Sequence, residues 1–177
     1  MNTLVKAENT AITRKKPSRP LLKAFDLKWV QTMNVLDFGC GKGADVRYMT
    51  DTLNIWAEGH DPAHGVHRTR NQYSTVFMNY VLNALDPEQR AAAFKEAWAL
   101  VERGGCLIVA TRRHVSRLAE RKGWEQYLDG YWTNKERGMF QAEIDLKYNM
   151  QFLPPTLWGP SKFHLSSDFY LAKYWKP

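Results

Sequence analysis

Three glycines and two acids form the part of the sequence with the clearest capacity for chemistry. Gly39, Gly41 and Gly43 alternate in "DFGCGKG", between an apolar segment and a segment of helical character. Glycines at such a junction let the backbone approach a ligand, and the amides that open a helix attract polar groups. Asp37 lies two residues before the first glycine, and Asp61 follows at about the 20-residue spacing of a ribose-binding acid. The pattern predicts a ligand-binding loop flanked by two carboxylates.

Two cofactor classes compete for this loop. The letters also match G-x-G-x-x-A through Ala44, a dinucleotide-binding fingerprint for which Asp61 would be the acid. A carboxylate at Asp37 would repel a pyrophosphate but attract the ammonium of an amino-acid moiety. S-adenosylmethionine carries such an ammonium, together with a ribose whose hydroxyls suit Asp61. We therefore expect S-adenosylmethionine as cofactor, and the alternative is a tight turn that binds nothing.

Strands alternate with helices around the loop, which favours an α/β fold with a mostly parallel sheet. Apolar and β-branched patterns predict strands at 34–38, 54–61, 73–80 and 106–112, and helices at 20–29, 44–53 and between Asp86 and Gly104. The segment "FHLSSDFYLAKYW" near the end of the chain indicates two short strands joined at "SSD", as an antiparallel end to the same sheet.

These residues carry a family resemblance. "VLDFGCGKG", with Asp61 on the following strand and Asn79 and Tyr80 at the end of the next, resembles class I S-adenosylmethionine-dependent methyltransferases. Over nearly all of the chain, "TAITRKKPSRP", "GHDP", "NYVLNALDPEQRAAAFKEAWAL" and "DGYWTNKERGMFQ" resemble the methyltransferases associated with DNA phosphorothioation gene clusters. The resemblance implies a Rossmann-like sheet in which Asp37 organises the methionine amine through water. It also implies that the three glycines line the amino-acid end, that Asp61 accepts from the ribose hydroxyls, and that Asn79 and Tyr80 lie beside the sulfonium and the acceptor.

The sequence departs from that family in two places. Only eleven residues separate Asp61 from Tyr73, too few for the helix and strand that normally intervene. The missing strand lies at an edge of the methyltransferase sheet, so we expect a sheet shortened at one edge and an adenine pocket without the side chain supplied there. The third strand ends in "MNYV" and not in the N/D-P-P-Y of enzymes that methylate amino groups of DNA bases, which argues against a standard enzyme of that type.

The charge of the chain favours an anionic partner such as nucleic acid. It has 25 Lys and Arg against 18 Asp and Glu, a formal charge of +7. Arg14 and Arg19 lie in a basic N-terminal arm at 1–20 and are predicted to contact phosphates. A disordered arm and an arm folded over the cofactor site are the alternatives. Arg112 closes the fourth strand, at the edge of the sheet where α/β proteins bind ligands, and is a predicted substrate contact.

A second group of candidates follows the fourth strand. Arg117, Arg121 and Lys122 on a predicted helix fit an ordinary charged face as well as a track for nucleic acid. "DGYWTNKERGMFQ" is predicted to be a loop in which Gln141 contacts the substrate. Its aromatic residues, Trp132 and Phe140, either stack on a flipped base or belong to the core.

Histidine and cysteine offer little further chemistry. His60, His64 and His67 cluster beside Asp61, but with that acid assigned to ribose we expect solvent-exposed histidines and no metal site. The two cysteines form neither a CxxC motif nor a disulfide framework, and Cys40 is expected to be a spacer in the loop. No apolar run approaches the roughly 20 residues that span a bilayer, so no membrane partner is expected.

The sequence as a whole predicts one cytoplasmic methyltransferase domain over 1–177, which acts on nucleic acid by in-line methyl transfer. A small-molecule methyltransferase and a module that binds the cofactor without chemistry are the alternatives. The sequence says nothing of the oligomeric state.

Overall fold

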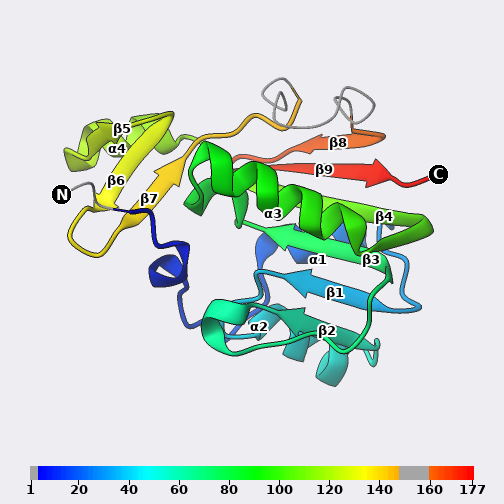
Figure 1. Ribbon diagram of the computed structural model, residues 1–177. Coiled ribbons are helices and arrows are strands. Elements are labelled where there is room, and N and C mark those ends of the chain that lie inside the picture. The colour runs from blue at the N-terminus through cyan, green and yellow to red at the C-terminus, as the bar shows by residue number, and fades with distance from the viewer. Residues whose placement is uncertain (1–3, 148–159) are drawn as a thin grey trace.

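The computed structural model describes residues 4–147 and 160–177, which include a six-stranded sheet in the order β2-β1-β3-β4-β9-β8 (Figure 1). The strands are β1 (Val35–Phe38), β2 (Ala57–His60), β3 (Tyr73–Asn79), β4 (Val101–Arg112), β8 (Lys162–Leu165) and β9 (Phe169–Trp175). The first four are parallel, β9 runs antiparallel to β4, and the edge strand β8 runs antiparallel to β9. The predicted α/β sheet with an antiparallel C-terminal end is confirmed.

The sheet is shortened at the edge formed by β2, as predicted. From Asp61 the chain passes through the short helix η3 (Pro62–His64), closes an isolated bridge between Asp61 and Val66, and enters β3 at Tyr73. No strand pairs with the outer side of β2 within the described residues. The connection is too short to build one.

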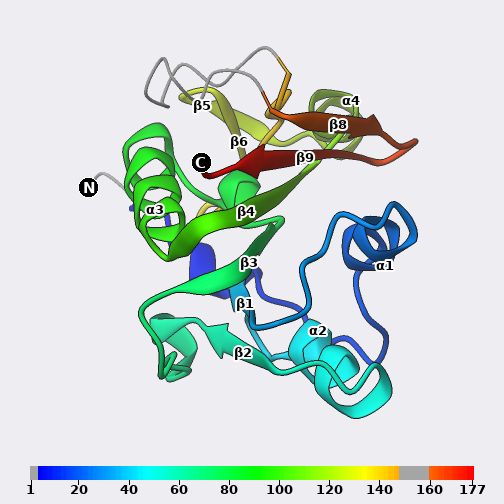
Figure 2. The same cartoon turned by 90° about the vertical axis from the view of Figure 1, so that its right-hand side faces the viewer.

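Helices cover both faces of the sheet (Figure 2). On one face lie α1 (Arg19–Asp26) and α2 (Ala44–Arg47), which continues into the π-helical turn η2 (Tyr48–Thr52). The other face carries α3 (Pro87–Ala99), which begins at the predicted cap: Asp86 and Gln89 form a capping box, and proline occupies the first turn. Successive side chains of β1 point to opposite faces of the sheet, so Leu36 packs on the α3 side and Val35 on the α1 side.

A smaller sheet lies beyond the carboxyl ends of the parallel strands (Figure 1). It contains β5 (Glu125–Tyr127), β6 (Gly130–Asn134) and β7 (Met139–Ala142), and α4 (Val115–Lys122) packs against it. The prediction of a loop at 129–141 was therefore wrong, since most of this segment is a hairpin. Trp132 is 4% exposed and Phe140 is fully buried, so of the two alternatives for these rings the structure supports the core and not base stacking. They pack edge to face with centroids 6.0 Å apart and form part of the core.

The N-terminal arm is folded against the rest of the protein. It contains the short helix η1 (Ala7–Thr10), and the backbone of Lys6 donates to the carbonyl of Gly138 at 2.9 Å. The side chain of Asn9 donates to the carbonyl of Arg137 at 2.7 Å. The arm thereby connects the hairpin of β6 and β7 to the main sheet. No helix within residues 4–147 and 160–177 combines the length and apolar character needed to cross a membrane.

Candidate active site

The glycine loop and Asp61 are in direct contact. The backbone amide of Gly41 donates to Asp61 Oδ2 at 2.9 Å, and that of Gly39 donates to the carbonyl of His60 at 2.7 Å. Gly39 has a φ of +73°, and a Cβ there would lie 2.5 Å from a methyl group of Val81. Both the backbone conformation and the contact therefore require glycine at this position. The two predicted parts of the cofactor site meet at the carboxyl ends of β1 and β2.

Asp37 lies behind the loop. Its side chain is 2% exposed and is not among the groups that line the main cavity. Burial raises the pKa of Asp37 well above its usual range, and the nearby carboxylate of Asp45 raises it further, while Arg14 opposes both. An ammonium bound beside the loop would favour the ionised form of Asp37, as the sequence prediction requires.

Asp45 is the site residue that the sequence predictions missed. It is fully buried in the first turn of α2 and accepts hydrogen bonds from the Ser18 amide at 2.6 Å and the Ser18 hydroxyl at 2.7 Å. Arg14 pairs with it at 3.2 Å, and the amide of Asn79 donates to it at 3.3 Å. An acid in the first turn of a helix is ordinarily explained by the helix dipole. Only the folded arm shows that this carboxylate joins three segments of the chain.

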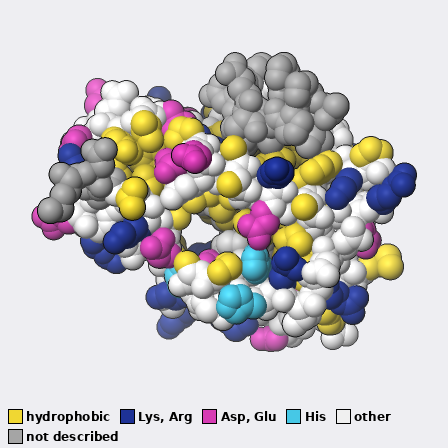
Figure 3. Space-filling view, in the orientation of Figure 1, with side chains coloured by type: hydrophobic (Ala, Val, Ile, Leu, Met, Phe, Trp, Pro, Cys, Tyr) yellow, Lys and Arg dark blue, Asp and Glu magenta, His cyan; other side chains and the backbone are white. Residues whose placement is uncertain are grey.

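A cavity of about 1140 Å³ opens at this edge of the sheet, between the glycine loop, the arm, α3 and the hairpin. Figure 3 shows the surface hollowed between the hairpin part and the main sheet. Nine of the predicted site residues line the cavity: Gly39, Gly41, Asp61, Asn79, Tyr80, Arg14, Arg19, Arg112 and Gln141. Gly43, like Asp37, does not; it borders a separate pocket of about 360 Å³ behind the loop.

Asn79 and Tyr80 end β3 at the cavity. Asn79 Oδ1 is buried and has no hydrogen-bond partner among the described residues, whereas its amide nitrogen is held by Asp45. Tyr80 has a φ of +61°, and its amide donates to the carbonyl of Ala110 at 2.9 Å. Burial, with a smaller contribution from Asp168, raises the pKa of Tyr80 to about 12. The phenol is therefore protonated at neutral pH and can donate a hydrogen bond.

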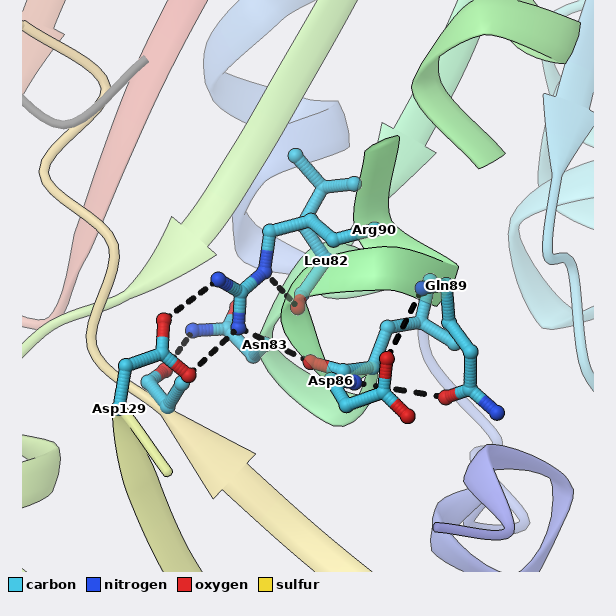
Figure 4. A network of polar contacts seen from close by, with 8 residues as sticks. Leu82, Asn83, Asp86, Gln89, Arg90 and Asp129 are labelled. Carbon is cyan, nitrogen blue, oxygen red and sulfur yellow. Dashed lines mark hydrogen bonds and ion pairs between the residues drawn. The ribbon is translucent and has the colours of Figure 1, made fainter. Parts of the chain in front are cut away.

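A polar network holds the segment that follows Tyr80 (Figure 4). Asn83, in the short helix η4 (Leu82–Ala84), donates to the carbonyl of Ala142 at 2.6 Å and accepts from the amide of Arg112 at 2.8 Å. Arg90 on α3 donates to the carbonyl of Leu82 and pairs with Asp129 at 2.6 Å. These contacts tie the ends of β3 and β4 to the hairpin, so the walls of the cavity are fixed relative to one another.

The predicted substrate arginines have different surroundings. Arg14 is engaged by Asp45, and Arg19 pairs with Asp168 at 2.7 Å in a largely exposed ion pair. Two-point contact of Arg14 and Arg19 with phosphates would compete with these two ion pairs. The side chain of Arg112 makes no hydrogen bond or ion pair with the described residues, and Arg112 lines the cavity close enough to Tyr80 to lower the pKa of that phenol slightly. Of the alternatives for the arm, folding over the loop fits the structure.

Solvent-exposed histidines were expected, and this prediction is wrong for His60, which is buried, whereas His67 is exposed. His60 is 8% exposed and lies 3.4 Å from a carboxylate oxygen of Glu96, while His64 lies 3.0 Å from Asp61. The residues described contain no group of three or more His, Cys, Asp and Glu side chains arranged for a metal ion. Burial raises the pKa of Cys40 to about 12, so its thiol is protonated and suits the predicted role of spacer.

No protein-family model matches the sequence, and no curated protein matches it significantly. Solved structures do match. A S-adenosylmethionine-dependent methyltransferase from Methanosarcina mazei has a TM-score of 0.60 at 13% identity, over 86% of this chain and 98% of its own. The 1,6-didemethyltoxoflavin-N1-methyltransferase of Burkholderia thailandensis, solved with S-adenosylhomocysteine, has a TM-score of 0.60 at 12% identity, over 88% of this chain and 76% of its own. An O-methyltransferase family protein of the same organism has a TM-score of 0.62 at 11% identity, over 88% of this chain and 55% of its own. The chain has the Rossmann-like fold that these methyltransferases share.

Proposed function

We propose that the protein is a S-adenosylmethionine-dependent methyltransferase. The observation that carries the proposal is the contact between Gly41 and Asp61 at the mouth of a large cavity, in a fold whose structural neighbours are methyltransferases. The carboxyl edge of a parallel sheet is where α/β proteins bind their ligands.

The residues present fit this cofactor. Gly39 and Gly41 expose backbone to the cavity, Asp61 offers a carboxylate for the ribose hydroxyls, and Asp37 is an acid close behind the loop. Gly43 shapes the same turn from the other side. When bound, the cofactor supplies a methyl group on a sulfonium whose leaving thioether is neutral.

The protein's own task is then to hold the acceptor in line and close, which removes much of the entropic barrier of a bimolecular reaction. Asn79 offers an unused acceptor and Tyr80 a phenolic donor at the end of β3. Both are suited to orienting a polar acceptor atom. The high pKa values of Tyr80 and Cys40 make neither an effective base near neutral pH.

For the acceptor we retain nucleic acid, the acceptor that the sequence predicted. The net charge of +7 and the position of Arg112 and Gln141 at the cavity support it. Arg14 and Arg19 would assist where their ion pairs open. A small-molecule acceptor is the second candidate, because the cavity is bounded by the arm and the hairpin and one structural neighbour is named for a small-molecule substrate.

The test uses methyl-labelled S-adenosylmethionine with DNA, RNA and a metabolite extract, and asks which fraction becomes labelled. Asp61→Ala should weaken cofactor binding by about 10- to 100-fold, the value of one hydrogen bond to a charged group. Asp26→Ala is the matched control, since Asp26 is an exposed acid on α1 whose partner is Lys23. Absence of cofactor binding by the wild type would refute the function. Label in metabolites alone would refute the nucleic-acid acceptor.

A further inference from the structure

Two arginines on one face of α4 lie in the lining of the cavity. Arg117 and Arg121 are four residues apart, so they lie on the same side of the helix, and both line the cavity. The opposite side of α4 buries Val115 and Ala119 against the hairpin. Arg112 lines the same cavity from the end of β4. We call Arg112, Arg117 and Arg121 the arginine face.

Cations outnumber acids around this cavity. Six arginines and one lysine line it, against four carboxylates: Arg14, Arg19, Arg112, Arg113, Arg117, Arg121 and Lys42 face Glu8, Asp61, Glu96 and Asp168. Two of the arginines, Arg14 and Arg19, are neutralised by internal ion pairs. The guanidinium groups of the arginine face have no ion-pair or hydrogen-bond partner within the part of the chain that the structure describes.

This arrangement is unfavourable in the free protein. Like charges four residues apart destabilise a helix, and guanidinium groups that share a concave surface repel one another more strongly than on an open one. Arg112, Arg117 and Arg121 are exposed, and all three line this cavity together with Leu118 of α4.

The base of the arginine face is held rigidly. The amide of Arg112 donates to Asn83 at 2.8 Å. The neighbouring Arg113 donates to the carbonyl of Ser166, and its guanidinium lies 5.3 Å from the ring centroid of Tyr170. The position at which Arg112 leaves the sheet, next to Asn79 and Tyr80, is therefore defined before any ligand binds.

We propose that the arginine face binds a phosphate group of the methyl acceptor and so holds the acceptor against the end of β3. The planar guanidinium fork matches a phosphate in two-point hydrogen bonding. The phosphate can belong to a nucleic-acid backbone or to a small phosphorylated molecule. This inference rests on the proposed function but concerns a different wall of the cavity from the glycine loop and Asp61.

Direct binding tests it. Inorganic phosphate and a single-stranded thymidine decanucleotide are titrated at low salt against the wild type, Arg112→Ala and the double variant Arg117→Ala/Arg121→Ala. The matched control is Arg103→Ala/Lys122→Ala, which removes the same charge from exposed positions that do not line the cavity. We expect the variants of the arginine face to weaken anion binding at least tenfold, the control less than threefold, and S-adenosylmethionine affinity to change less than twofold in all.

Tight oligonucleotide binding that is lost in the double variant assigns the anion to nucleic acid, and binding of phosphate alone assigns it to a small acceptor. The inference is overturned when the wild type binds neither probe, or when the control loses as much affinity as the double variant. Binding of S-adenosylmethionine is measured separately. If the wild type does not bind it, the proposed function is refuted but the anion site is not.

Discussion

Asp45→Ala should detach the N-terminal arm from the glycine loop and destabilise the whole protein. The carboxylate is fully buried and receives two hydrogen bonds from Ser18, at 2.6 and 2.7 Å, besides its ion pair with Arg14 at 3.2 Å. Alanine would leave the buried Ser18 groups and a part-buried guanidinium without their acceptor. Because Ser18 also caps α1, the damage should extend to the start of that helix.

The size of the effect follows from these contacts. Hydrogen bonds to a charged group each contribute about 1.5–3 kcal/mol, and removal of one partner of a buried ion pair costs about 3–5 kcal/mol. Since the bonds to Asp45 share one carboxylate, their contributions do not add. We therefore expect the free energy of unfolding to fall by about 3–5 kcal/mol. Asp45→Asn keeps one acceptor oxygen and should lose about 1–2 kcal/mol.

Urea unfolding followed by tryptophan fluorescence measures both variants, and a double-mutant cycle with Ser18→Ala isolates the shared contact. The cycle should give a coupling energy of about 1–3 kcal/mol, because either single change already breaks the Ser18 hydroxyl bond to Asp45. If the free energy of unfolding of Asp45→Ala lay within about 1 kcal/mol of the wild-type value, or if the coupling energy were near zero, the arm would not be held in this way.

Further predictions concern the loop, the buried acid and the network. Gly39→Ala should lower stability by about 2–4 kcal/mol, from backbone strain and the contact with Val81, while Gly104→Ala, with a similar φ and open space, should lose only about 1–2 kcal/mol in the same urea assay. Folding raises the pKa of Asp37 above its ordinary 3.8, so the folded state holds a proton that the unfolded state releases. The stability contributed by protonated Asp37 is therefore complete below pH 3.8 and is lost as the pH rises through the folded pKa. Asp37→Asn should remove this pH dependence from urea midpoints measured against pH. Arg90→Ala should cost about 3–5 kcal/mol and Arg19→Ala less than about 1 kcal/mol, since the first ion pair has a buried arginine and the second is largely exposed; equal losses in thermal or urea unfolding would contradict this reasoning.

Local signals in the sequence predicted most of the main sheet and the glycine loop at the edge where the cavity opens. The capping residue Asp86 marks the start of α3, and the short span between Asp61 and Tyr73 predicted the missing edge strand. Alternating glycines after an apolar strand predicted the loop that meets Asp61. These features depend on neighbours along the chain or on the length of a connection, and both can be read without coordinates.

Tertiary structure alone decided which of these residues face the cavity. Asp45 looked like an ordinary acid at a helix start, yet Ser18, 27 residues earlier, makes it the centre of the arm's attachment. Trp132 and Phe140 looked available for stacking, and the hairpin buries them. The sequence predicted a substrate contact for Arg112 and left Arg117 and Arg121 open between a solvated face and a track for nucleic acid. Only the packing of α4 against the hairpin shows that the three line one cavity. The physical reason is that burial and charge pairing depend on residues far apart in the sequence, whose encounter is set by the packing of whole elements and not by any local pattern.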